Sequence, residues 1–271
     1  MMATTKSRSE RSNIRITSNT IDMERPRAWL MAGVQDFRDA MGASLTYGAF
    51  WVVVSFLITL VVFSLDLWHF LLPLMAGFML LGPLIAVGAY AISQKLERGE
   101  TPKVSDAFGA WGRRTGQLVM MGLILALFFM AWFDLAIILF ALFFGLMAPD
   151  PATLYLALLT TPQGWGMILV GTVLGGAVAF GAFSVSVVAI PTLMDQDLTF
   201  MEGIEASIRS VAHNFRPMLL WGAILTGCVI IGLVTFYIGL AFILPILGHA
   251  SWHAYRDLVR IEPRVNAKES A

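Results

Sequence analysis

His249 and His253 are the residues of this sequence whose types and spacing are best suited to chemistry. They lie four residues apart in LGHASWHAYRDL (247–258), so a helix presents both rings on one face. Two histidines in this arrangement can bind a metal ion or a haem, but a metal site needs a third or fourth ligand. The remaining histidines are His69 and His213, and only His213 is expected on the same side of the membrane.

The neighbours of this pair favour a structural interpretation. Trp252, Tyr255 and Arg256 are the mixture that anchors the end of a helix at lipid headgroups. We therefore interpret His249 and His253 as helix-end packing and anchoring residues, with a metal or haem site as the weaker alternative. The sequence predicts no bound cofactor and no catalytic residue.

Asp134 is an ionisable residue within the long apolar run ALFFMAWFDLAIILF (126–140). Intramembrane carboxylates are functional candidates by default, so Asp134 is a possible transport or polar site. If the helix starts near Leu118, however, Asp134 lies ~24 Å along it, close to the outer interface. Trp132 beside it fits an aromatic belt. We therefore favour an interfacial position over proton or cation handling.

Small residues and prolines mark the predicted fourth, second and sixth membrane spans. Gly171, Gly175 and Ala179 follow a small-xxx-small pattern that lets helices approach closely. We interpret them as packing residues; a passage lined by small residues is the alternative. Pro83 and Pro245 remove a backbone hydrogen bond within apolar segments and predict helix kinks. Equivalent kinks in two hairpins can also mark a transport site.

Motifs of soluble enzymes are not apparent in the sequence. There is no glycine-rich phosphate loop, no HExxH, no nucleophile elbow and no evident Ser/His/Asp arrangement. The single cysteine, Cys228, cannot form an intramolecular disulfide, and no Cys/His cluster indicates zinc. The sequence therefore predicts a protein that is not an enzyme.

Composition indicates a membrane protein. The chain of 271 residues is 58% hydrophobic and 13% charged, with a mean hydropathy of +0.75. A soluble domain contains about 25% charged residues, roughly twice that share. A helix needs about 20 apolar residues to cross the bilayer. Six segments meet this requirement and predict an all-α polytopic protein, with spans near 44–65, 68–93, 118–147 and 164–191, and two more from 218–255, divided near 237–239.

The positions of the basic residues set the predicted topology. With six spans and a cytoplasmic N-terminus, all 18 Lys and Arg residues lie on the cytoplasmic side, as the positive-inside rule requires. With five spans, Arg256, Arg260, Arg264 and Lys268 would lie outside. We therefore predict a multi-pass membrane protein with both termini in the cytoplasm.

A threefold pattern runs through the predicted spans. Three segments before the odd-numbered spans carry apolar residues at i, i+4 and i+7, typical of an amphipathic helix in the membrane interface. Gly48, Gly122 and Gly222 each follow the middle apolar residue by 14 positions. The expected unit is one interfacial helix and one transmembrane hairpin. The apolar positions are Leu30, Val34 and Phe37; Val104, Phe108 and Trp111; and Ile204, Ile208 and Val211.

The domain organisation follows from this pattern. We expect a single six-helix membrane domain over 26–260, with pseudo-repeats at about 28–96, 102–196 and 200–258. The segment 1–25 holds too little apolar surface to offset the entropy of ordering and is predicted to be a disordered cytoplasmic tail. The segment 261–271 is expected to be a second tail.

Three stretches resemble a known bacterial family: PLMAGFMLLGPLIAVGAYAISQKLERGE (73–100), FALFFG (140–145) and LGHASWHAYRDL (247–258). The family consists of predicted integral membrane proteins, mostly proteobacterial, classed as a domain of unknown function. The resemblance covers roughly 25–260 and implies an inner-membrane location, with no established activity and no site residues. Some members carry the label "cytochrome c oxidase subunit I". We reject that label because those oxidases need more histidine ligands than the four present here.

Three functions remain open. The leading hypothesis is a non-enzymatic scaffold or assembly partner in the lipid bilayer that binds other membrane proteins or a second copy of itself, and no nucleic acid. The alternative is a transporter or channel for a small solute or a lipid, motivated by the repetition, the kinks and Asp134. The third is a redox protein with haem or metal at His249 and His253.

Overall fold

The protein is a bundle of long apolar helices. The computed structural model describes residues 14–113, 115–145 and 151–263. Within these ranges, four helical segments are long and apolar enough to cross a membrane. A helix needs about 20 apolar residues to do so. They are α3 (Met41–Ser64), α8 (Thr115–Phe144), α10 and α11 taken together (Pro162–Asp195), and α13 (Phe215–Val234). The chain is therefore a helical membrane protein.

The predicted second span is a broken helix. It consists of the 3-10 turn η1 (Trp68–Phe70) and three helices, α4 (Leu71–Leu80), α5 (Gly82–Ile85) and α6 (Val87–Glu97). Pro83 lies in the first turn of α5, where its missing N–H interrupts the hydrogen bonds of the preceding helix. The predicted kink is therefore a break, and crossing of the membrane by this segment stays a prediction.

The last apolar block divides where the sequence predicts it. Between α13 and α14 (Leu240–Leu258) the chain turns through Phe236 and Tyr237, whose φ angles are 53° and 64°. Pro245 lies inside α14 and does not end it. α14 is not among the four apolar spans because its second half carries polar and charged residues, so a sixth crossing also stays a prediction.

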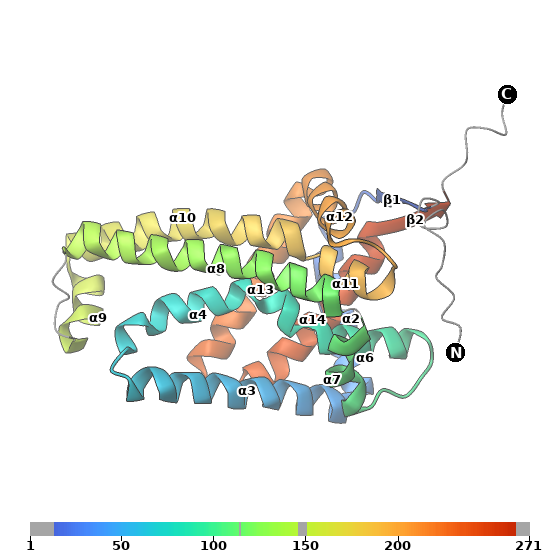
Figure 1. Cartoon of the computed structure of the whole chain (residues 1–271), viewed down its shortest axis with the longest axis horizontal. Coiled ribbons are helices and arrows are strands. Elements are labelled where there is room, and N and C mark those ends of the chain that lie inside the picture. Colours follow the sequence, from blue (N-terminus) through green and yellow to red (C-terminus); the bar gives the residue numbers. More distant parts are fainter. Residues whose placement is uncertain (1–13, 114, 146–150, 264–271) are drawn as a thin grey trace.

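The remaining elements are short. The segment between the predicted third and fourth spans contains α9, which the sequence analysis did not anticipate, at the left of Figure 1. The amphipathic segments form helices before α3, α8 and α13, as predicted. The short elements are β1 (Ile14–Ser18), α2 (Arg25–Asp39), α7 (Val104–Arg113), α9 (Pro151–Thr160), α12 (Phe200–His213) and β2 (Val259–Pro263). The long span Pro162–Asp195 consists of α10 (Pro162–Ser186) and α11 (Ala189–Asp195).

The two strands differ from the expected terminal tails. β1 and β2 form an antiparallel pair in which Ile14 lies opposite Pro263 and Ser18 lies opposite Val259. The chain is thus structured from residue 14, inside the segment predicted to be disordered, because its backbone groups find partners at the other end of the sequence. The rest of both predicted tails, 1–13 and 264–271, lies outside the described residues.

The amphipathic helices connect successive parts of the bundle. α7 contacts α6, and α12 contacts α11, so each contacts the even-numbered span that precedes it in the chain. α2 has no preceding span and contacts α14, the last helix of the chain. A threefold repeat requires this pattern of contacts, although the repetition itself stays a prediction.

α14 is buried among four other helices. It contacts α2, α3, α6 and α13, and its buried residues lie on several sides of the helix. Two glycines allow the closest approaches. A Cβ atom on Gly33 of α2 would lie 2.5 Å from the carbonyl oxygen of Ile246, and one on Gly48 of α3 would lie 2.0 Å from that of Ala241. Small residues at helix contacts are typical of membrane bundles.

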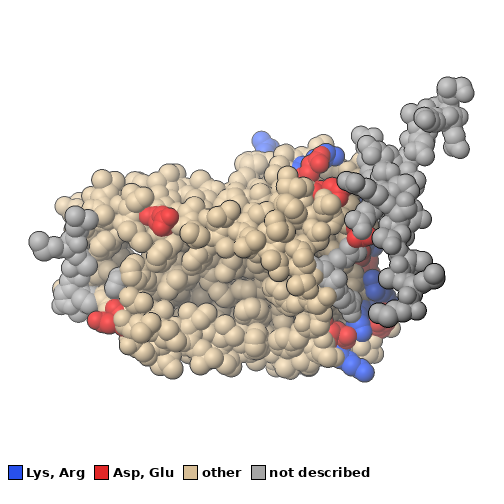
Figure 2. Space-filling view, viewed as in Figure 1, with Lys and Arg blue, Asp and Glu red and all other residues tan. Residues whose placement is uncertain are grey.

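Charge is distributed unevenly along the long axis. On the face shown in Figure 2, Lys and Arg gather at one end, whereas Asp and Glu occur at both ends. We call the end at which the Lys and Arg side chains gather the charged end. It carries α2, α7 and α12, the end of α6, the end of α14 and the paired strands (Figure 1). The first and last described residues therefore lie at the same end of the molecule.

Candidate functional site

The imidazole of His249 is buried at the centre of the bundle, on the charged half of α14. Its Nε2 atom lies 2.9 Å from the Ser44 hydroxyl of α3, and its Nδ1 atom lies 2.8 Å from the Ser93 hydroxyl of α6. All three side chains are at most 1% exposed. Gly248 makes this approach possible, since a Cβ there would lie 2.5 Å from the Cβ of Ala89. The ring therefore joins three helices.

A carboxylate extends this cluster toward the surface. The Ser93 hydroxyl donates a hydrogen bond to Asp36 Oδ2 at 2.6 Å, and His253 Nε2 lies 3.0 Å from the same oxygen. Because the single proton of Ser93 goes to Asp36, Ser93 accepts from His249 Nδ1–H, and the neutral ring then accepts from Ser44 at Nε2. We call these five residues, Asp36, Ser44, Ser93, His249 and His253, the His249 network.

This network is a Ser/His/Asp arrangement that was not evident from the sequence. A nucleophilic serine needs a base that takes its proton, which His249 resembles, and also access for a substrate. Ser44 has an exposed fraction of 0%. In this structure the network therefore joins α2, α3, α6 and α14, and it leaves no room for an acyl substrate at the hydroxyl.

The histidines do not converge on a common ligand. His249 has serine partners on both ring nitrogens, and His253 contacts Asp36. His213 contacts the Thr20 hydroxyl at 2.9 Å, whereas the side chain of His69 lies outside the described residues. No group of three or more His, Cys, Asp or Glu side chains in the described ranges is placed to bind a metal. The geometry thus gives the weaker, metal or haem hypothesis no support.

A second polar cluster surrounds Asp195 at the charged end. Its Oδ1 atom accepts a hydrogen bond from Gln94 at 3.0 Å, and its Oδ2 atom accepts from Tyr255 and Gln196 at 2.8 Å. Arg256 Nη1 lies 3.4 Å from the same Oδ2 atom. The sequence analysis did not identify Asp195. Its position just beyond an apolar segment was the available signal, because such a carboxylate needs nearby donors.

Ion pairs join further elements at this end. Asp257 of α14 binds Arg25 and the indole N–H of Trp29, both on α2. Lys95 of α6 lies 3.0 Å from Asp106 of α7, and this hydrogen bond raises the pKa of the lysine. Each of these contacts joins an amphipathic helix to a neighbouring helix of a predicted even-numbered span.

Asp134 lies on the outer surface of α8 and is exposed. The neighbouring Trp132 points inward and donates its N–H to the carbonyl oxygen of Pro73 at 2.9 Å. Asp134 does not line the cavity described below. The structure therefore separates the predicted polar site from the interior of the bundle.

A cavity of about 690 Å³ is lined by residues of α10 and by residues of α4 to α6, α13 and α14. Its lining is largely apolar, and its polar groups are hydroxyls and the indole N–H of Trp132, which donates to Pro73. Its hydroxyl-bearing residues are Tyr90, Thr172, Ser186, Thr226 and Ser251.

Small residues form much of the cavity wall. A Cβ on Gly175 would lie 2.4 Å from the Trp132 ring, and one on Gly171 would lie 3.7 Å from Leu139, so both glycines also face α8 as predicted for packing residues. Ala179 lines the cavity, as do Gly176 of α10 and Gly227 of α13. A Cβ on either of these two glycines would have nothing within 4 Å. The walls are therefore smooth, and open space separates α10 from α13.

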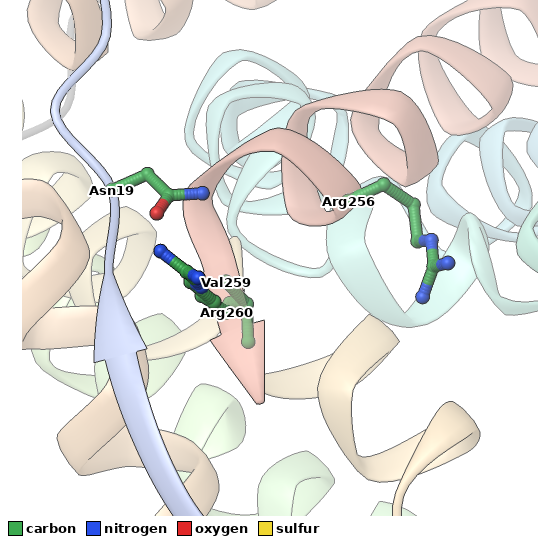
Figure 3. Close-up of a pocket in the computed structure, with 4 residues that line it drawn as sticks. All are labelled: Asn19, Arg256, Val259 and Arg260. Atoms are coloured by element: carbon green, nitrogen blue, oxygen red, sulfur yellow. The ribbon is translucent and has the colours of Figure 1, made fainter. Parts of the chain in front are cut away.

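A second pocket, of about 520 Å³, lies at the charged end beside the paired strands. Asn19, Arg256, Val259 and Arg260 line it (Figure 3). Arg260 lies beside Asn19, whereas Arg256 extends away from both and pairs with Glu97 at 2.9 Å. An anion site requires converging donors. This pocket does not provide them.

Comparison with known proteins gives one match. Residues 71–195 match a family model described as predicted integral membrane protein (DUF2189). Neither the curated proteins nor the solved structures give a significant match. The match is shorter than the resemblance predicted for 25–260, and it includes Pro83, Tyr90 and the small-residue face of α10. Over residues 71–195, this chain is therefore similar to the DUF2189 family of predicted integral membrane proteins.

Proposed function

We propose that this protein binds the hydrocarbon chain of a lipid in the cavity between its hairpins, and that it holds or carries lipids in the bacterial inner membrane. The cavity is the observation that carries the proposal. Its volume of about 690 Å³ is within the range of roughly 300–1,000 Å³ that is usual for small-molecule sites. Both a membrane-spanning chain and an apolar cavity are required for such a role.

The chemistry of the walls favours a lipid over a polar solute. The described residues that line the cavity include no Lys, Arg, Asp, Glu or His, so a charged solute would lose its hydration without compensation. Along α10 the lining runs from Gly171 to Val187, a helical rise of ~24 Å. This length is most of the ~30 Å thickness of the hydrocarbon core of the bilayer. An extended hydrocarbon chain matches both the polarity and the shape.

The other transport hypothesis loses one of its supports. A channel for a small solute was motivated by the repetition, the kinks and Asp134, and Asp134 is exposed and lies outside the cavity lining. The scaffold hypothesis keeps one specific observation, the open space in front of Gly176 and Gly227. Small residues of this kind also accept a partner helix. A partner protein in the same groove is therefore the second candidate.

Filling the cavity tests both candidates. We expect the double variant Gly176→Leu and Gly227→Leu to retain at most about one tenth of the lipid that co-purifies with the wild type. Each leucine side chain enters open space without a clash and fills part of the cavity. Native mass spectrometry of protein extracted in mild detergent measures this loss. Gly116→Leu is the matched control, since a Cβ there also has nothing within 4 Å and Gly116 does not line the cavity.

Two results would contradict the lipid proposal. One is equal lipid retention by the wild type and the double variant. The other is a stoichiometric protein subunit that the leucines displace, which would instead support the scaffold function.

The orientation of the charged end belongs to the same proposal. The basic residues at one end support an orientation with six crossings in which that end and both termini face the cytoplasm. A reporter enzyme that is active only in the periplasm should therefore be inactive when fused after residue 271. The same enzyme inserted between α8 and α9 should be active. An active C-terminal fusion would reverse the proposed orientation.

A further inference from the structure

One enclosed part of the cavity wall carries a pair of hydroxyls. Tyr90 of α6 is 1% exposed and Ser251 of α14 is 6% exposed, yet both line the cavity. Ser251 is a polar neighbour of the Tyr90 hydroxyl. Thr172 and Thr226, by contrast, lie on exposed parts of α10 and α13 at the opening. The buried pair is therefore the polar feature that an enclosed ligand would contact.

The hydrogen bonds of this pair are incomplete. Most buried hydroxyls in membrane helices donate to the carbonyl four residues earlier, as Ser55 does to Trp51 and Ser186 does to Ala182. Among the described residues, no backbone carbonyl accepts a proton from Tyr90 or Ser251. Two hydroxyls carry two protons, and one of these can lie between the two oxygens. The other proton is free for an acceptor oxygen in the cavity.

The charge of the lining restricts that acceptor. A phosphate or carboxylate drawn into the cavity would be an uncompensated charge in an apolar surrounding, because the described lining residues include no basic side chain. An uncharged oxygen needs only one hydrogen-bond donor in the cavity, and leaving water costs it much less hydration free energy than it costs a charged group. The site thus discriminates by head group, against charged lipids and in favour of neutral ones.

We propose that Tyr90 and Ser251 bind the uncharged hydroxyl or ester carbonyl of a neutral lipid, such as a monoacylglycerol or a long-chain alcohol, whose chain occupies the cavity. This inference rests on the proposed function and specifies its ligand class. Phospholipids then form the bilayer around the protein, and the cavity excludes their charged head groups.

Photolabelling of the full chain in lipid nanodiscs tests the inference. One probe is a monoacylglycerol with a diazirine near the end of its acyl chain, and the other is a phosphatidylglycerol with the same chain. We expect the neutral probe to label 171–187 and 219–230, mapped by mass spectrometry of peptides, and the anionic probe to label them at least about fivefold less.

Conservative variants assign the head group. Tyr90→Phe and Ser251→Ala each remove one hydroxyl and keep the apolar volume. Each should reduce labelling by the neutral probe about five- to tenfold, as for the loss of one buried hydrogen bond. Tyr237→Phe and Ser184→Ala are matched controls, because Tyr237 contacts Thr59 at 2.9 Å and Ser184 donates to Phe180 at 2.7 Å, away from the cavity.

The outcomes separate the two proposals. Equal labelling of the cavity segments by both probes, or labelling that is unchanged in both Tyr90→Phe and Ser251→Ala, would overturn the head-group inference and leave the lipid cavity intact. Absence of labelling in both segments with either probe would overturn the lipid cavity and the inference with it. Thermal unfolding confirms that each variant is folded.

Discussion

Replacing Gly48 by alanine is expected to lower the free energy of unfolding by at least about 3 kcal/mol, the upper end of the usual effect of overpacking. The new Cβ would lie 2.0 Å from the carbonyl oxygen of Ala241 and 2.9 Å from the ring of Pro245. Backbone atoms cannot turn aside as a flexible side chain can, so α3 and α14 must separate. Thermal unfolding in detergent, followed by circular dichroism, measures the change.

The equivalent glycines of the threefold pattern are the controls. A Cβ on Gly122 would lie 3.7 Å from Leu84, and a Cβ on Gly222 would lie 3.9 Å from Phe183, both ordinary contacts. Gly122→Ala and Gly222→Ala should be neutral or stabilising by up to about 1 kcal/mol, since alanine is the better helix former. A loss of stability in all three variants would contradict the packing described here, as would a harmless Gly48→Ala.

Replacing Asp36 by alanine is expected to destabilise the protein by about 2–4 kcal/mol, because it removes the acceptor of the His249 network. Ser93 would then keep a proton without an acceptor at a site that is 1% exposed, and His253 would lose its partner on α2. Unfolding measured in detergent near neutral pH gives this change. The effect should extend to α6 and α14, which both lose a contact with α2.

Asp39→Ala is the matched control for this prediction. Asp39 is exposed and accepts a hydrogen bond from Gln35 of the same helix, so its removal should change stability by no more than about 0.5 kcal/mol. Asp36→Asn keeps an acceptor oxygen for Ser93 and should recover part of the loss. If Asp36→Ala proved as mild as Asp39→Ala, the network would make no contribution to stability.

The helices of this fold could be predicted because their signals are local. Apolar length predicts the four long spans, and the turn at Phe236 and Tyr237 lies where the last block exceeds one crossing. The strand β1 could not be predicted, since five residues of mixed polarity become a strand only beside Val259–Pro263. Its partner lies at the other end of the sequence, and no local pattern indicates it.

The site was less predictable, for the same reason. His249 was identified and interpreted as a packing residue, but its serine partners are 205 and 156 residues away in sequence. Tyr90 and Ser251 carry no motif, and they become a pair only when α6 lies beside α14. The small residues of α10 were found from their spacing. That spacing cannot show which of their faces packs on a helix and which faces a cavity.

The central position of α14 has a consequence for how the protein is made. It contacts α2, α3, α6 and α13, all of which leave the ribosome before it does. Until α14 is inserted, the approach surfaces of Gly33 and Gly48 are empty, and Ser44 and Ser93 lack His249. The earlier helices are therefore expected to stay incompletely packed against one another until α14 is synthesised. Chains that stop before α14 are therefore expected to leave these helix surfaces unpacked and prone to misassembly.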